Sequence, residues 1–231
     1  MSPLEYGNVI RRKLVRLTEI TKELKPNQIK ILTNEGDHMN TFYPTRAQAF
    51  DLLRQYNQNE YLIKHALAVE AVMRHFAGLF GEDIEKWGII GLVHDLDYER
   101  FPEEHCVKTN EILTENNWPQ DYIRAIVSHG WRICSDVEPK EKMEKVLYTI
   151  DELTGLVTAV TLVRPDKNIL NLEVKSVKKK WKEKSFAAGV NREIIAEGAA
   201  MLEMDLETVI GETIRGMQSI AKELGLDGIK E

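Results

Sequence analysis

Apolar residues recur at helical spacing through most of the chain after Pro44. Thr45, with Gln48 at the capping-box position, predicts the start of a first helix, and Asn59 and Asp83 can cap the next two. The helix after Asn59 has an apolar stripe made of Leu62, Ala66, Val69, Val72, Met73 and Phe76. No stretch shows sustained alternation with β-branched residues, so the sequence predicts an all-α fold with little or no sheet.

The same periodicity predicts further helices over residues 103–116, 119–129, 140–163, 169–184, 191–204 and 206–224. We expect residues 39–165 to form a helical core. Residues 166–231 should add C-terminal helices that pack on this core, because no low-complexity linker separates the two parts.

Residues 1–38 differ from the rest, with a possible basic amphipathic helix over residues 4–24 that joins no recognisable motif. Residues 35–39 can be encoded by GAA GGA GAT CAC ATG, which contains a purine-rich ribosome-binding sequence before an ATG codon. Met39 is therefore a candidate natural start, and residues 1–38 are either a translated leader or an N-terminal extension.

Composition sets the broad class of the protein. With 231 residues and 43% hydrophobic composition, the chain can bury one core. No run approaches the roughly 20 apolar residues of a membrane span, and basic residues interrupt the start of the chain where a secretory signal needs an apolar segment. Two cysteines give no disulfide framework, so a cytoplasmic location is the default expectation. The net charge of -6 argues against a general nucleic-acid binder.

The candidate chemistry centres on His94 and Asp95, which close an apolar run that begins near Ile84. Burying a carboxylate without a partner costs several kcal/mol, roughly, so an ion or hydrogen-bond donors should meet this pair. Imidazole nitrogen and carboxylate oxygen are both good ligands for divalent metals. The alternative is a chance pair at a solvated helix end.

Other residues fit the metal interpretation. Asp151 interrupts a second apolar stretch, where the alternative partner is a buried arginine, and His65 lies beside the apolar stripe, where a hydrogen-bonded histidine at the core edge is the alternative. The order of a lone histidine, a His-Asp pair, further histidines and a distant aspartate resembles the HD-domain superfamily of metal-dependent phosphohydrolases. The resemblance covers roughly residues 60–160.

The resemblance implies an HD-type helical bundle in which His65, His94, Asp95 and Asp151 bind a divalent ion such as Fe, Mn, Zn, Ni, Co or Mg. Asp95 would also orient the attacking water. His105 and His129 are either ligands of a second ion or donors that stabilise phosphoryl charge, and a solvated surface position is a further alternative for His105, which follows Glu103 and Glu104. One or two ions per chain are therefore expected.

The implied activity is hydrolysis of a phosphate ester or anhydride through a metal-activated water, on a small molecule for which a nucleotide is the expected class. The alternative is a non-catalytic, metal-stabilised protein that binds or senses a nucleotide. Hydrolysis of a bond other than phosphate is a third interpretation, because a fold does not fix chemistry. A homo-oligomer is compatible with the sequence.

Two features depart from the family pattern or lie outside it. Asp97, which follows the His-Asp pair, is a candidate general acid or supporting carboxylate, and Arg100 is a candidate phosphate contact. Capping or a salt bridge is the alternative role for either residue. A lysine patch around Trp181 includes Lys178 and Lys179, which could bind substrate phosphate. The alternative for the patch is a solvated helix face with Trp181 inserted in the core.

Overall fold

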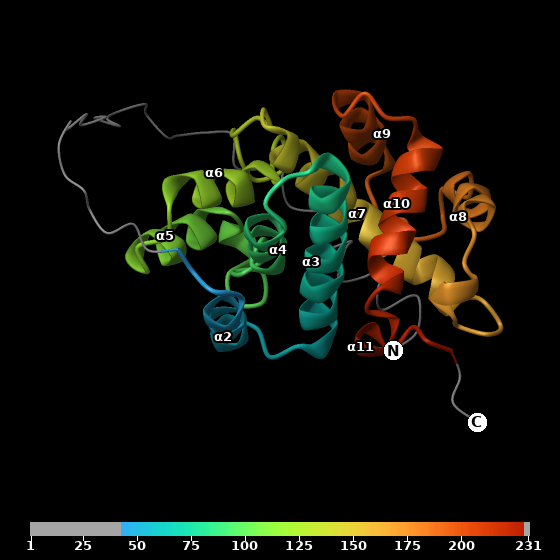
Figure 1. The fold of residues 1–231 in the computed structure, drawn as a ribbon, viewed down its shortest axis with the longest axis horizontal. Coiled ribbons are helices and arrows are strands. Elements are labelled where there is room, and N and C mark those ends of the chain that lie inside the picture. The colour runs from blue at the N-terminus through green and yellow to red at the C-terminus, as the bar shows by residue number, and fades with distance from the viewer. Residues whose placement is uncertain (1–42, 229–231) are drawn as a thin grey trace.

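The computed structural model describes residues 43–228, and within this range the chain forms ten α-helices, two short 3-10 helices and no β-strand (Figure 1). The all-α prediction is therefore confirmed. The predictions for residues 1–38 and for Met39 lie outside the described residues. The helices are α2 Arg46–Tyr56, α3 Glu60–Phe80, α4 Ile84–Leu92, α5 Val107–Glu115, α6 Gln120–Ser128, α7 Lys142–Leu162, α8 Val174–Trp181, α9 Arg192–Met201, α10 Leu206–Gln218 and α11 Ala221–Leu224, with 3-10 helices η1 Pro102–Glu104 and η2 Ile169–Asn171.

The first three described helices begin where the capping residues predict. Thr45 and Gln48 form a complete capping box, in which each side chain bonds the backbone of the other residue. The Asn59 side chain accepts from the N–H of Tyr61, and the Asp83 side chain accepts from the N–H of Lys86. α3 ends at Gly81, which has the left-handed φ of 70° that glycine adopts without strain.

Three of the predicted helices are interrupted. The prediction of a helix over 103–116 is wrong at its start. Cys106 has a φ of 68°, which a right-handed helix cannot contain, so α5 begins only after this residue. The segment 169–184 divides into η2 and the shorter α8, and the segment 206–224 divides into α10 and α11 at Ile220. α4 also ends at Leu92, so His94 and Asp95 lie in the turn that follows the helix rather than in its last turn.

Two 21-residue helices, α3 and α7, occupy the middle of the molecule. α2, α4, α5 and α6 lie on one side of them, and α8, α9 and α10 lie on the other (Figure 1). α4 packs closely on α3 at Gly91, where an added Cβ would be 2.8 Å from Cγ of Met73. α9 packs on α7 in the same way at Gly198. One continuous cluster of buried apolar residues joins both sides.

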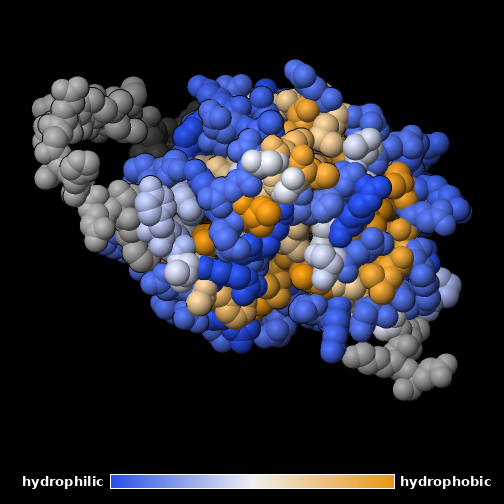
Figure 2. All heavy atoms as spheres, viewed as in Figure 1, coloured by the Kyte–Doolittle hydropathy of each residue, from blue (hydrophilic) through white to orange (hydrophobic). Residues whose placement is uncertain are grey.

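Polar side chains cover most of the face drawn in Figure 2, and apolar residues reach the surface in its middle and toward the side where α10 and α8 lie. None of the helices within residues 43–228 is long and apolar enough to cross a membrane.

Candidate metal centre

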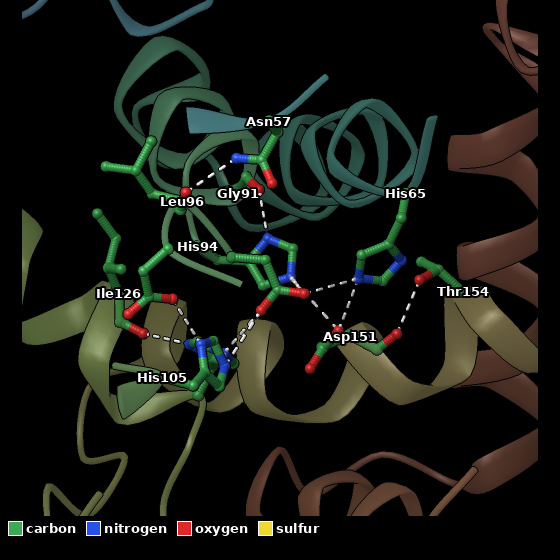
Figure 3. Close-up of polar contacts among 12 residues, drawn as sticks. Asn57, His65, Gly91, His94, Leu96, His105, Ile126, Asp151 and Thr154 are labelled. Carbon is green, nitrogen blue, oxygen red and sulfur yellow. Dashed lines mark hydrogen bonds and ion pairs between the residues drawn. The ribbon is translucent and has the colours of Figure 1, made fainter. Parts of the chain in front are cut away.

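Candidate ligand side chains that are far apart in the sequence meet at one place between α3, α4, α6 and α7 (Figure 3). They form two groups whose ligand atoms lie within 4.8 Å of one another. We name these groups the first position, made of His65, His94, Asp95 and Asp151, and the second position, made of Asp95, His105 and His129. All six residues were predicted as candidate ligands, and the fold brings all six together.

The first position joins α3, the turn after α4, and α7. Oδ1 of Asp151 lies 3.0 Å from Nε2 of His65 and 3.4 Å from Nε2 of His94. Oδ2 of Asp95 lies 3.6 Å and 3.5 Å from the same two nitrogens. Ligands bound at about 2.1 Å to one ion lie about 3 to 3.5 Å from each other, so these spacings suit a single divalent cation.

The second position uses the other oxygen of Asp95. Oδ1 of Asp95 lies 3.3 Å from Nε2 of His105 and 3.3 Å from Nε2 of His129. The two imidazole nitrogens are 3.2 Å apart. Asp95 therefore faces both positions, with one oxygen directed to each, and would offer one ligand atom to an ion at either position.

Hydrogen bonds on the far side of the imidazole rings set the orientation of three of the histidines. Nδ1 of His94 donates to the carbonyl oxygen of Gly91 at 2.8 Å, and Nδ1 of His129 donates to that of Ile126 at 2.5 Å. Nδ1 of His105 donates to Oδ1 of Asp97 at 2.7 Å. A neutral ring that donates from Nδ1 presents an unprotonated Nε2, which is the form that binds a metal.

Protonation of these histidines at Nδ1 leaves their Nε2 atoms without hydrogen-bond donors to meet, which is the environment that a metal ion fits. With both Nδ1 atoms donating, Nε2 of His105 and Nε2 of His129 are two hydrogen-bond acceptors that face each other at 3.2 Å. Nε2 of His94 is buried and has no hydrogen-bond partner within the described residues. Buried polar atoms of this kind are costly unless a cation meets them, so the donor set fits divalent metal ions.

The carboxylates of the site also favour a bound cation, as their effect on the pKa values of two histidines shows. Burial lowers the pKa of His94, but Asp95 and Asp151 outweigh this effect and raise the pKa to about 10. Burial also opposes protonation of His105, yet its bond to Asp97 and the charge of Asp95 give it a raised pKa. The carboxylates of Asp95, Asp97 and Asp151 therefore favour positive charge beside these rings, which a bound divalent ion would supply.

The turn that holds His94 and Asp95 is fixed by neighbouring elements. The Asn57 side chain donates to the carbonyl oxygen of Leu96 at 2.8 Å. Oε2 of Glu99 accepts from the backbone N–H groups of Gln58 and Asn59 at 2.7 Å and 2.9 Å. The connection between α2 and α3 thus anchors the middle and the later part of the turn, on the C-terminal side of Asp95.

Asp97 lies behind His105 and belongs to neither ligand group. It is fully buried, and its two oxygens accept from Nδ1 of His105 and from the backbone N–H of Thr109, the latter at 2.8 Å. Of the roles considered from the sequence, this placement favours a supporting carboxylate that also caps the first turn of α5 over a general acid, because Asp97 contacts the site through His105.

The fold does not bring the candidate phosphate contacts to the metal positions. The Arg100 guanidinium bonds the carbonyl oxygen of Gln55 and lies 5.0 Å from the centre of the Tyr56 ring. Lys178, on α8, forms an ion pair with Glu207, and Lys179 is exposed on the same helix. α8 lies on the far side of α7 and α10 from α4 and α6 (Figure 1), and the half-buried Trp181 packs against the core. The lysine patch is therefore a solvated helix face.

Comparison with known families supports the metal interpretation. Residues 62–158 match the family model of the HD domain. These residues correspond to an HD domain. All six candidate ligands lie within the matched residues. HD domains bind divalent metals and define a superfamily of metal-dependent hydrolases. Searches of curated proteins and of solved structures found no match.

One pair of residues beside the HD-domain ligands was not singled out from the sequence. Sγ of Cys106 lies 3.0 Å from Sγ of Cys134. The bond between the two thiols and burial raise the pKa of Cys106. The adjacency of Cys106 to His105 was the only available signal, because the spacing of 28 residues to Cys134 carries no motif.

Proposed function

We propose that this protein is a metal-dependent phosphohydrolase that hydrolyses a phosphate ester or anhydride of a small molecule, with nucleotides as the first substrate class to test. The observation that carries the proposal is the geometry of Asp95, which offers one oxygen to each of two groups of imidazole nitrogens. Paired divalent ions are a recurring solution for phosphoryl transfer to water.

The charge of the site supports an anionic substrate. Asp95 and Asp151 are the carboxylates that face the two positions, and the histidines bind metals in their neutral form. Two divalent ions would leave the centre with net positive charge, which attracts a phosphate group. When bound, the ions activate water and neutralise charge on the phosphoryl oxygens.

The exposure of the ligands indicates the side from which a substrate arrives. The His65 side chain is 16% exposed, whereas those of His94 and His129 are 0% and 1% exposed. Solvent reaches the centre beside α3, so the substrate phosphate would approach there. His94 and His129 act from the closed side, where they hold the ligand geometry fixed.

The test combines metal analysis with a substrate screen. Protein loaded with Mn²⁺ is analysed for metal content and assayed for phosphate release from nucleoside mono-, di- and triphosphates and from sugar phosphates. We expect close to two ions per chain in the wild type, loss of both in Asp95→Ala, loss of at least the first in Asp151→Ala, and activity at least 100-fold lower in both variants. Asp121→Ala, which removes an exposed partner of Lys86, serves as the matched control.

Two results would count against the proposal. A reloaded wild type that binds no metal contradicts the metal centre itself. Full metal occupancy with nucleotide binding and no turnover contradicts the enzymatic role and supports the non-catalytic nucleotide-binding protein instead.

A further inference from the structure

The two cysteines of the chain form a close pair beside the second position. Sγ of Cys106 and Sγ of Cys134 are 3.0 Å apart, and neither is in a disulfide. Cys106 is 1% exposed, whereas Cys134 is half-buried, so a small reagent reaches Cys134 first. The sequence contains two cysteines in total, so any intramolecular disulfide must join this pair.

Each cysteine is tied to a different histidine of the second position. Cys106 directly follows His105. Cys134 lies in a turn that closes on Gly130, whose carbonyl oxygen accepts from the N–H groups of Cys134 at 2.9 Å and Ser135 at 3.0 Å. Gly130 in turn follows His129. A bond between the two sulfurs would therefore connect the backbone segments that carry the two histidines.

Gly130 makes room for this pair. A Cβ at this position would lie 2.4 Å from Sγ of Cys134 and 2.5 Å from Sγ of Cys106. Both sulfurs therefore occupy space that glycine leaves open. The left-handed φ of 68° at Cys106 directs its side chain into this space at some cost in backbone energy.

We propose that Cys106 and Cys134 are a redox-active pair that a peroxide converts to an intramolecular disulfide, which thiols reduce again. In the first step, the half-buried Cys134 thiol takes one oxygen from hydrogen peroxide to give a sulfenic acid and water. In the second step, the Cys106 sulfur attacks the sulfenic sulfur of Cys134, and the S–S bond forms as the S–O bond breaks. The leaving hydroxyl takes up the proton of the Cys106 thiol, which gives a second water. The two electrons go to the peroxide.

The disulfide would weaken metal binding at the second position. A disulfide bond is about 2.05 Å long, so the sulfurs must approach by about 1 Å. This movement pulls the backbone of His105, whose ring is held by a 2.7 Å bond to Asp97, and the turn beside His129. Metal sites tolerate ligand displacements of only about 0.2 Å. This consequence rests on the proposed second metal position, whereas formation of the disulfide does not.

The experiment uses full-length protein with Mn²⁺, treated with hydrogen peroxide and then with dithiothreitol. We expect the number of reactive thiols in the denatured protein to fall from two to zero, a monomeric band on a non-reducing gel, and recovery of both thiols on reduction. The second ion should bind about tenfold more weakly in the oxidised form. Cys134→Ser should bind two ions and keep them under peroxide, and Cys106→Ser provides the reciprocal variant.

The outcomes separate this proposal from the proposed function. Persistence of both thiols under peroxide, or a disulfide that joins two chains, overturns the redox pair whatever the metal content. A disulfide that leaves both ions bound with unchanged affinity overturns the link to metal binding. Reduced wild type that never holds a second ion contradicts the binuclear centre, while the thiol count still decides whether the pair is redox-active.

Discussion

At the residue scale, the hydrogen bonds of the Nδ1 atoms set the orientation of the imidazole rings in the candidate metal centre. His94 and His129 donate to backbone carbonyl oxygens, which no side-chain substitution can remove directly. His105 donates instead to Asp97, so its orientation depends on one carboxylate. Outer partners of this kind fix the tautomer and raise the basicity of the ligand.

Replacing Asp97 should therefore affect the two positions unequally. In Asp97→Asn, one oxygen becomes an amide donor, so the residue can no longer accept from both His105 and the N–H of Thr109. We expect the second ion to bind about 10- to 100-fold more weakly, with the first ion retained. Titration of metal-free protein with Mn²⁺ measures both affinities. Asp121→Asn is the control, and equal loss of both ions would show that Asp97 acts on the fold as a whole.

Asp95 and Asp151 were predictable from the sequence as candidate ligands, because a carboxylate inside an apolar run requires a partner wherever the helices place it. His65 became a candidate only through the resemblance to the family, because a histidine beside an apolar stripe can equally be a hydrogen-bonded residue at the core edge. The choice between a metal ligand and a phosphoryl donor for His105 and His129 was not predictable. Both roles need the same residue type, and only the 3.2 Å approach of the two nitrogens favours metal binding. Arg100 and the lysines were weaker candidates because charge alone does not determine which side of a helix bundle a residue reaches.

At the scale of elements, the helix starts were predictable and several helix ends were not. Capping side chains act within one turn, so Thr45, Asn59 and Asp83 identify their helices locally. The break at Cys106 has no comparable signal, because its left-handed backbone is set by contacts with the distant turn at Gly130. That break places His105 in the site.

The packing of α9 on α7 provides a prediction at this scale. An alanine Cβ at position 198 would lie 2.0 Å from Oγ1 of Thr149 and 3.1 Å from its Cα, so the helices must separate. We expect Gly198→Ala to lower the free energy of unfolding by about 1 to 3 kcal/mol. Gly211→Ala, in α10, meets only Val174 at 3.5 Å and should be neutral or stabilising by up to about 1 kcal/mol. Urea denaturation measures both, and equal effects would contradict the packing argument.

A contact between α3 and α10 gives a prediction about pH. Nε2 of His75 lies 2.7 Å from Oε2 of Glu212, which also pairs with Arg215. Burial would raise the pKa of Glu212, but Arg215 and His75 outweigh it, so the pKa lies below its ordinary value of 4.5. A depressed carboxyl pKa adds stability above the unfolded-state value, and this contribution is lost as the pH falls through the folded-state value.

Glu212→Gln should therefore be less stable than wild type by about 1 kcal/mol at pH 7, and the difference should shrink below pH 4. Urea denaturation of both proteins at pH 7 and pH 3.5, with a chelator present throughout, removes any contribution from metals. Glu207→Gln, which removes an exposed partner of Lys178, is the control. A difference that stays constant with pH would mean that the Glu212 charge does not stabilise the fold.

At the scale of the whole molecule, the candidate ligands come from α3, the turn after α4, the segment before α5, the end of α6, and α7, so a bound ion would connect these elements in addition to their apolar packing and ion pairs. We expect a chelator to lower the melting temperature and Mn²⁺ to restore it, because an ion that binds only the folded state at 100 times its Kd stabilises by about 2.7 kcal/mol. Asp95→Ala should melt at the same temperature with and without Mn²⁺. Thermal denaturation followed by circular dichroism measures this, and an Mn²⁺-dependent shift that persists in the variant would place the binding elsewhere.

The 86 residues that separate His65 from Asp151 have a consequence for the order of events in folding. Bringing such distant side chains together costs loop-closure entropy that the apolar contacts of α3 and α7 must first offset. We therefore expect the ion to bind a chain that has already folded rather than to act as a template for folding. Metal loading should leave the folding rate unchanged and slow unfolding, so the bound ions make the native state kinetically persistent.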